Sequence, residues 1–191
     1  MRILLIMLLC LPLSARAETA SAWNIQQLMQ SLAGVKEAKG SFVENKFLSV
    51  LNRPLESTGV LVFQAPGHLE KHTLTPKAET LVLDQGVLTI DNRARNIKRT
   101  LVLQEYPAIW AFVESIRATL AGDLPTLKRF YKIELEGKAA HWKMRLLPVE
   151  SKMREMISEI RIAGHSTWVD SIETLEANGD RTLMKVVEAK L

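Results

Sequence analysis

The chain has 191 residues, of which 47% are hydrophobic and 24% are charged, a composition typical of globular proteins and unlike that of disordered or collagen-like chains. The 25 basic and 21 acidic residues give a net charge of +4 and are mixed along the chain, so we expect no nucleic-acid partner. The single cysteine excludes a disulfide within the chain.

The first 17 residues have the pattern of a secretion signal. Arg2 precedes the apolar run Ile3–Leu11, and Ala15-Arg16-Ala17 supplies the small residues that signal peptidase requires. The apolar run has about half of the roughly 20 residues that a membrane-spanning helix needs. We therefore predict a signal peptide over residues 1–17 and a single domain over residues 18–191. Cleavage removes the only cysteine and two arginines, which lowers the net charge from +4 to +2.

The first half of the predicted domain combines one short helix with closely spaced strands. Ile25, Leu28, Met29 and Leu32 recur at helical spacing, which predicts an amphipathic helix over residues 23–32. The β-type runs that follow are too close together for crossover helices, so we expect antiparallel neighbours. These strands are expected at Ser41–Leu51, Ser57–Gln64, His68–Thr75, Glu79–Asp84, Val87–Asp91 and Ile97–Leu103.

The second half of the domain begins with a helix and returns to strands. Apolar residues at helical spacing predict a helix from Pro107 to Gly122. Residues 151–162 fit either a helix or a strand, and we expect a short turn followed by a strand. The other strands are expected at Lys128–Glu136, His141–Leu147, Trp168–Ala177 and Arg181–Glu188.

These elements predict an α+β fold that is mainly antiparallel β. About eleven strands would form a large sheet, with two helical pieces covering one of its faces. The run Val60–Phe63 is apolar on both alternating faces. Such a strand lies either between two covered faces or in a sheet that curls around an apolar interior filled by helices or a ligand.

No motif in the sequence indicates a catalytic or metal site. On a strand, His68 and His72 would lie about 13 Å apart and could not share one metal ion, so we expect an exposed strand surface around Glu70. No nucleophile motif or phosphate-binding glycine loop is present in the sequence. We therefore expect a protein that is not an enzyme and that uses no cofactor or metal.

One basic cluster is a candidate contact for a lipid head group or another anionic partner. Its members are Arg93, Arg95, Lys98 and Arg99, and polar and small residues interrupt it. A solvated loop leading into a strand explains the same pattern, and both interpretations remain open.

Apolar side chains on the predicted strands and the central helix are candidates for lining an interior cavity. The sequence does not separate plain core residues from residues that contact a ligand. The candidates for the cavity and a helical lid are Phe42, Phe47, Leu61, Phe63, Leu81, Leu83, Leu101, Leu103, Ile109, Trp110, Phe112, Val113, Ile116, Trp142 and Met144.

The order of several local patterns carries a family resemblance. After the opening helix come "KGSFVENKF", "STGVLVFQAPG" and "LVLDQGVLTIDN", then the central helix, "MRLLPVES" and the closing hairpin "IETLEANGDRTLMKV". In this order, the chain resembles the periplasmic outer-membrane lipoprotein carriers of the LolA-like family over nearly its whole length after the signal. The resemblance implies a curled, unclosed antiparallel barrel whose mouth is plugged by helices and whose apolar cavity takes up acyl chains.

The resemblance also implies a function. The protein would be a monomeric periplasmic carrier that takes an acylated lipoprotein or another lipid from an inner-membrane export machinery to an outer-membrane acceptor, with only transient membrane contact. Two alternatives remain: a periplasmic sensor or regulator that recognises lipid or a partner protein, and an enzyme of lipid or glycan metabolism.

Two positions depart from the family pattern and indicate a divergent branch. Glu44 stands where the family usually has Gln, and Leu69-Glu70-Lys71 stands where the family has an Arg next to an aromatic residue. That Arg is understood to hold the helical lid closed, a role that does not carry over to Glu70. Lys71 is the candidate replacement, although its ammonium lacks the planar fork of a guanidinium. The cargo of such a branch could be another acylated or polyene-type lipid.

Overall fold

The computed structural model describes residues 23–189, so the predicted signal peptide lies outside the described residues. The helices are α1 (Ile25–Ala33), α2 (Pro107–Leu120), α3 (Leu124–Phe130) and α4 (Ser151–Arg154), with short 3-10 turns η1 (Arg93–Arg95) and η2 (Leu103–Glu105). The strands are β1 (Glu37–Phe47), β2 (Leu55–Gln64), β3 (His68–Thr75), β4 (Glu79–Asp84), β5 (Val87–Asn92), β6 (Ile97–Val102), β7 (Tyr131–Lys138), β8 (His141–Pro148), β9 (Ile157–His165), β10 (Trp168–Glu176) and β11 (Arg181–Glu188).

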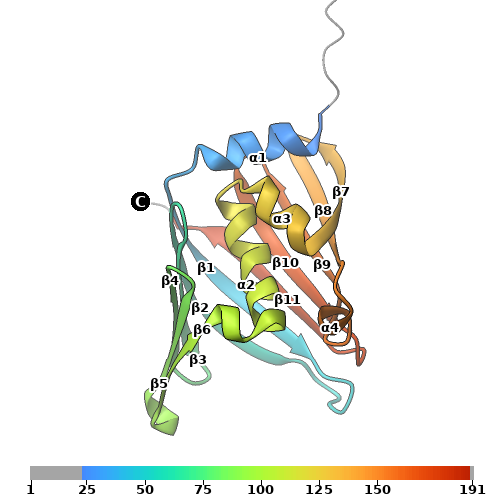
Figure 1. The fold of residues 1–191 in the computed structure, drawn as a ribbon. Helices are drawn as coiled ribbons and strands as arrows, with labels where there is room; N and C mark the ends of the chain where they lie inside the picture. Colours follow the sequence, from blue (N-terminus) through green and yellow to red (C-terminus); the bar gives the residue numbers. More distant parts are fainter. Residues whose placement is uncertain (1–22, 190–191) are drawn as a thin grey trace, which may run out of the picture.

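These strands form one curled antiparallel sheet. Their order is β6-β5-β4-β3-β2-β1-β11-β10-β9-β8-β7, so within residues 23–189 β6 and β7 are edges that do not meet. Figure 1 shows helices α1, α2 and α3 on the concave side of the curl. The predicted fold, a mainly antiparallel and unclosed barrel with helices over its concave face, is confirmed.

The helix boundaries follow local chemistry. Asn24 caps α1 because its side chain accepts a hydrogen bond from Gln27 N, and Gln27 Oε1 accepts one from Asn24 N, which completes a capping box. Pro107 occupies the first turn of α2, as predicted. Gly122 ends that helical segment with a φ of +67°, and a Cβ there would lie 2.2 Å from Met29 O of α1. Any larger residue would therefore separate α1 from α2.

Two sequence predictions needed correction, and a third was confirmed. The predicted strand Lys128–Glu136 begins only at Tyr131, because Asp123 caps the unpredicted helix α3 by accepting from Thr126 N. The first strand spans Glu37–Phe47 rather than Ser41–Leu51, since the chain turns after Phe47. Residues 151–162 form the short helix α4 and the start of β9, in agreement with the expected turn and strand.

Strands β7–β10, together with α1, α3 and one side of α2, form a densely packed region that we call the filled half. Leu146 of β8 and Ile160 of β9 are fully buried there beneath Leu28 of α1 and Leu127 of α3. Tyr131 donates a hydrogen bond from its hydroxyl to Ala111 O of α2, and burial raises the pKa of Tyr131 well above its ordinary value. This packing fixes α2 against the sheet on one side.

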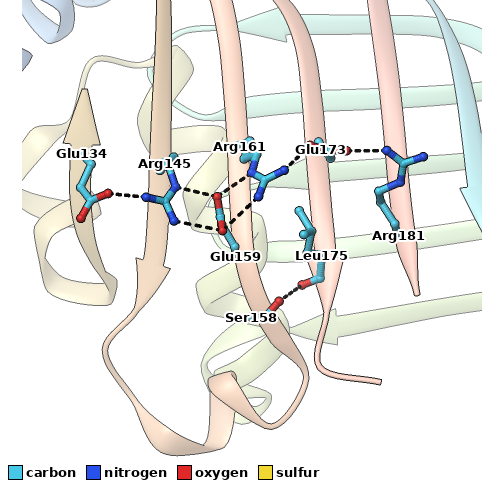
Figure 2. A network of polar contacts seen from close by, with 8 residues as sticks. All are labelled: Glu134, Arg145, Ser158, Glu159, Arg161, Glu173, Leu175 and Arg181. Carbon is cyan, nitrogen blue, oxygen red and sulfur yellow. Dashed lines mark hydrogen bonds and ion pairs between the residues drawn. The ribbon is translucent and has the colours of Figure 1, made fainter. Parts of the chain in front are cut away.

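The convex face of the sheet carries a row of alternating charges from β7 of the filled half to β11 (Figure 2). Consecutive partners lie between 2.6 and 3.2 Å apart in the order Glu134, Arg145, Glu159, Arg161, Glu173 and Arg181. Hydrogen bonds from Arg145 and then Arg161 lower the pKa of Glu159 to about 2. The row closes the outer face with paired charges and leaves the concave face as the apolar one.

Candidate functional site

A cavity of about 390 Å³ lies on the concave side between α2 and the other part of the sheet. Its walls come from β1–β5, from β10 with the preceding Thr167, from β11, and from the end of α1 with the connection that follows it, a region that we call the hollow half. The volume falls within the roughly 300–1,000 Å³ of typical small-molecule pockets. The helix side of the cavity consists of the apolar residues Ile109, Phe112, Val113, Ile116 and Leu120 of α2.

The strand wall is apolar because alternate residues of neighbouring strands align in rows. Phe63 of β2 pairs with Leu69 of β3, which pairs with Leu83 of β4, and Leu83 pairs with Leu88 of β5. All four side chains line the cavity. The apolar run Val60–Phe63 therefore belongs to a sheet that curls around an apolar interior, the second of the two interpretations open at the sequence level.

Eight of the fifteen residues predicted for the cavity and lid line this cavity. They are Leu61, Phe63, Leu81, Leu83, Ile109, Phe112, Val113 and Ile116. Their role in binding a ligand remains a prediction.

The other seven predicted residues do not line the cavity. Trp142 and Met144 are buried in the core of the filled half, and Trp110 packs edge-on against Phe130 at 5.2 Å between ring centroids. Phe47 lies beneath the Arg181 guanidinium, 4.2 Å from it, at the far end of β1. The remaining three are Phe42, which is buried under Lys71, Leu101 on the edge strand β6, and Leu103 in η2.

Several cavity residues were absent from the prediction. The closing strands contribute Trp168, Val169 and Ile172 of β10 and Met184 and Val186 of β11. Met184 and Val186 alternate with Leu183, Lys185 and Val187, of which only Lys185 is polar, so strand periodicity alone does not mark the inward face. Only the pairing of β11 with β1 brings them to the hollow half, and pairing between distant strands is not visible in periodicity.

One ion pair lies on the mainly apolar strand wall. Lys71 Nζ donates to Glu44 Oε2 at 2.7 Å, and Glu44 Oε1 accepts from Ser57 Oγ at 3.2 Å. The Lys71 ammonium also lies 5.1 Å from the centre of the Phe42 ring, a favourable cation–π contact. Both side chains of the pair are about one-fifth exposed, and both residues line the cavity.

Gly59 makes this arrangement possible. It pairs with Phe42, and a Cβ at Gly59 would lie 2.8 Å from the Phe42 ring and 2.0 Å from His72 O. Without that atom, the ring lies flat across β2, and Lys71 of β3 reaches over it to Glu44 of β1. The two positions that depart from the family pattern therefore contact each other.

The helix α2 is tied to the hollow half by Arg117 rather than by Lys71. Arg117 Nη1 donates to Pro66 O in the β2–β3 turn at 3.2 Å. Glu114 and Asp123 accept from the other guanidinium nitrogens at 2.7 and 2.8 Å. Burial raises the pKa of Asp123, but the hydrogen bonds from Arg117 and Thr126 together outweigh burial and hold this pKa below its ordinary value. The Arg117 guanidinium thus links α2 to the β2–β3 turn. Lys71, in contrast, contacts Glu44 and Phe42, which both lie on β1.

The histidine cluster of β3 lies on the convex face. Glu70 bridges His68 and His72, with 2.7 Å between Glu70 Oε1 and His68 Nε2, and these hydrogen bonds lower the pKa of Glu70. Across residues 23–189, no group of three or more His, Cys, Asp or Glu side chains is arranged to hold a metal ion.

The basic cluster lies at the connection from β5 to the edge strand β6. Arg95, Lys98 and Arg99 are exposed, and Arg93 opens the short turn η1. Exposed charges on an edge strand disfavour pairing with another sheet, which gives the cluster a structural role whether or not it meets a partner. In the part of the chain that the structure describes, no helix is long and apolar enough to cross a membrane.

Comparison with known proteins agrees with this architecture. Residues 17–189 match the family described as outer membrane lipoprotein carrier protein LolA-like. The chain belongs to this family. No curated protein sequence matches the chain.

Among solved structures, this LolA-like protein is similar to a LolA superfamily protein from Nitrosomonas europaea, with 7% identity, a TM-score of 0.48, and coverage of 89% of this chain and 94% of the other. It is also similar to a DUF1329 family protein from Desulfovibrio piger, with 9% identity, a TM-score of 0.49, and coverage of 85% and 88%. A third, LprF from Mycobacterium bovis, has 8% identity, a TM-score of 0.34, and coverage of 85% and 91%.

Proposed function

We propose that this LolA-like protein is a periplasmic carrier that shields an acyl chain of a lipoprotein or another lipid in the cavity of the hollow half. The observation that carries the proposal is the apolar cavity between α2 and the strands β1–β5. Membership of a family described as lipoprotein carriers supports the same conclusion.

The energy of hydrocarbon transfer explains why such a cavity is needed. Each buried methylene is worth about 0.8 kcal/mol, so about fifteen methylenes amount to roughly 12 kcal/mol. A carrier must provide comparable apolar surface when it is loaded and must cover that surface when it is empty. Helix α2 can do both, since its apolar side faces the cavity and its hold on the β2–β3 turn is one hydrogen bond from Arg117.

The carrier acts without catalysis or an energy source of its own. Cargo moves onward because the next site binds it more tightly, and loading is driven by an inner-membrane export machinery. An outer-membrane site receives the cargo, and the carrier travels as a monomer between the two membranes. Acyl chains enter and leave beside α2, and contact with either membrane is transient.

A binding experiment with two matched variants tests the carrier proposal. Ile116→Glu places a carboxylate on the cavity side of α2, whereas Leu74→Glu places one on β3 at a residue that is 61% exposed and outside the cavity wall. We expect Ile116→Glu to weaken binding of a fluorescent fatty acid at least about tenfold, since burying a charge beside hydrocarbon is unfavourable.

Leu74→Glu should bind like the wild type, and circular dichroism should confirm that both variants fold. Equal binding by wild type and Ile116→Glu would contradict the proposal. Conversion of the fatty acid or of an added lipid into another product would favour an enzyme instead.

A further inference from the structure

We infer that the ion pair of Lys71 and Glu44 selects the polar end of the cargo, and that it favours an amphiphile whose polar end is an uncharged hydroxyl or amide group. This inference rests on the proposed carrier function and assigns a head-group site within the same cavity. The pair stands on a wall that is lined mainly by apolar residues.

Stability alone does not account for charges at this place. A partly buried ion pair costs desolvation energy, and replacing such pairs by apolar residues is often neutral or stabilising. In the sheet register Lys71 lies between the apolar residues Leu61 and Leu81. Glu44 lies between Met184 and the polar Ser57. An apolar side chain in place of Lys71 would therefore continue the row of Leu61 and Leu81.

Both members of the pair retain hydrogen-bonding capacity. The Lys71 ammonium has three donors, of which one goes to Glu44 while one side of the group rests on the Phe42 ring. Glu44 accepts from Lys71 with one oxygen and from Ser57 with the other, and each carboxylate oxygen can accept a second bond. The wall thus offers a donor and an acceptor within one 2.7 Å pair.

The charge of the pair decides which polar end fits. An anionic head group would be attracted by Lys71 and repelled by Glu44 from nearly the same distance, and a cationic head group would meet the reverse. A hydroxyl or amide gains from both partners, because it donates to the carboxylate and accepts from the ammonium. An acyl chain joined through an amide has this chemistry, as does a monoacylglycerol.

The test compares amphiphiles with the same hydrocarbon chain and different polar ends. The probes are monopalmitoylglycerol, N-methylpalmitamide, palmitic acid and hexadecylamine, all below the concentration at which they form micelles and at neutral pH. Each displaces Nile red from the purified protein. We expect both neutral probes to displace the dye at about tenfold lower concentration than either charged probe.

Two variants test whether the pair causes the selection. Glu44→Gln leaves Lys71 unopposed and should shift the preference about tenfold toward palmitate, whereas Lys71→Met leaves Glu44 unopposed and should shift it about tenfold toward hexadecylamine. The ion pair of Lys46 and Glu176, which is partly exposed and lies outside the cavity lining, provides the control, since Lys46→Met should leave the ranking unchanged.

The outcomes separate the two proposals. If all four probes bind with equal affinity, or if the ranking is the same in wild type, Glu44→Gln and Lys71→Met, the head-group site is wrong while the carrier function stands. If a neutral probe binds best but the two neutral probes differ, their order identifies whether hydroxyl or amide is preferred and supports the site. If none of the probes displaces the dye, the carrier function itself is contradicted, and the head-group site falls with it.

Discussion

The filled and hollow halves are built on one concave face of one sheet, yet only the first is packed solid. Two helices, α1 and α3, lie over the filled half together with one side of α2, whereas the hollow half is covered by the other side of α2 and by Leu32 near the end of α1. Leu146 and Ile160 of the filled half are fully buried, while Leu81 of the hollow half is partly exposed on the cavity wall. The cavity therefore results from the number of helices available to cover the sheet rather than from a lack of large side chains.

The largest expected effect comes from making the same substitution in each half. Leu146→Ala removes side-chain atoms from a close-packed core and should lower the free energy of unfolding by about 3 kcal/mol. Leu81→Ala enlarges an existing cavity and should cost about 1 kcal/mol, because fewer contacts are lost. Urea unfolding of both variants measures the difference. Equal costs would mean that the hollow half is packed as well as the filled one.

The second prediction concerns the connection between the halves. Arg117→Ala breaks the contact with Pro66 O and leaves the buried Glu114 carboxylate without its partner, so it should cost about 1–2 kcal/mol of stability. Because the hydrogen bond from α2 to the β2–β3 turn is also lost, we expect Nile red to enter the empty cavity faster. Stopped-flow fluorescence measures the rate of entry.

Arg154→Ala is the matched control for Arg117→Ala. Arg154 also donates from a helix to backbone carbonyls, those of Pro148 and Val149, but it lies away from the cavity. Dye entry should keep the wild-type rate in this variant. If Arg117→Ala and Arg154→Ala both leave the rate unchanged, Arg117 does not hold α2 closed.

The smallest effect is expected on the convex face of the filled half. The pKa of Glu159 is lowered from 4.5 to about 2, so its ion pairs stabilise the fold above about pH 4.5, and this contribution is lost as the pH falls toward 2. Its arginine partners are exposed to solvent, and after screening we expect Glu159→Gln to cost about 1 kcal/mol at pH 7. The difference between wild type and Glu159→Gln should disappear near pH 2. A difference that is constant with pH would contradict this account.

Local patterns were sufficient to predict most of the elements. The helical spacing of Leu28 and Leu32, and Pro107 at the start of α2, gave both long helices, because these signals lie within a few residues of one another. Helix α3 was missed because it has only seven residues and its apolar residues Leu127 and Phe130 lead directly into β7. One or two turns of helix contain too few residues for their apolar spacing to be distinguished from that of a strand.

The candidate site was harder to predict because it depends on contacts between distant segments. Phe63 and Ile116 were identified as cavity residues, and both line it. Trp142 and Met144 have the same apolar character, but α1 and α3 cover them, which no local pattern reveals. The contact between Glu44 and Lys71 spans 27 positions and depends on Gly59, so the two departures from the family pattern could be seen in the sequence but their pairing could not.

Quenching of tryptophan fluorescence by a lipid with a brominated acyl chain tests most directly whether the chain occupies the hollow half. Trp168 lies on the cavity wall, and its ring packs against Gly40, where a Cβ would be 3.2 Å away, whereas Trp142 is enclosed in the filled half. We predict strong quenching in the wild type and in Trp142→Phe, and little quenching in Trp168→Phe, with equal lipid binding by all three proteins. Quenching that persists in Trp168→Phe and disappears in Trp142→Phe would place the chain elsewhere and contradict the account.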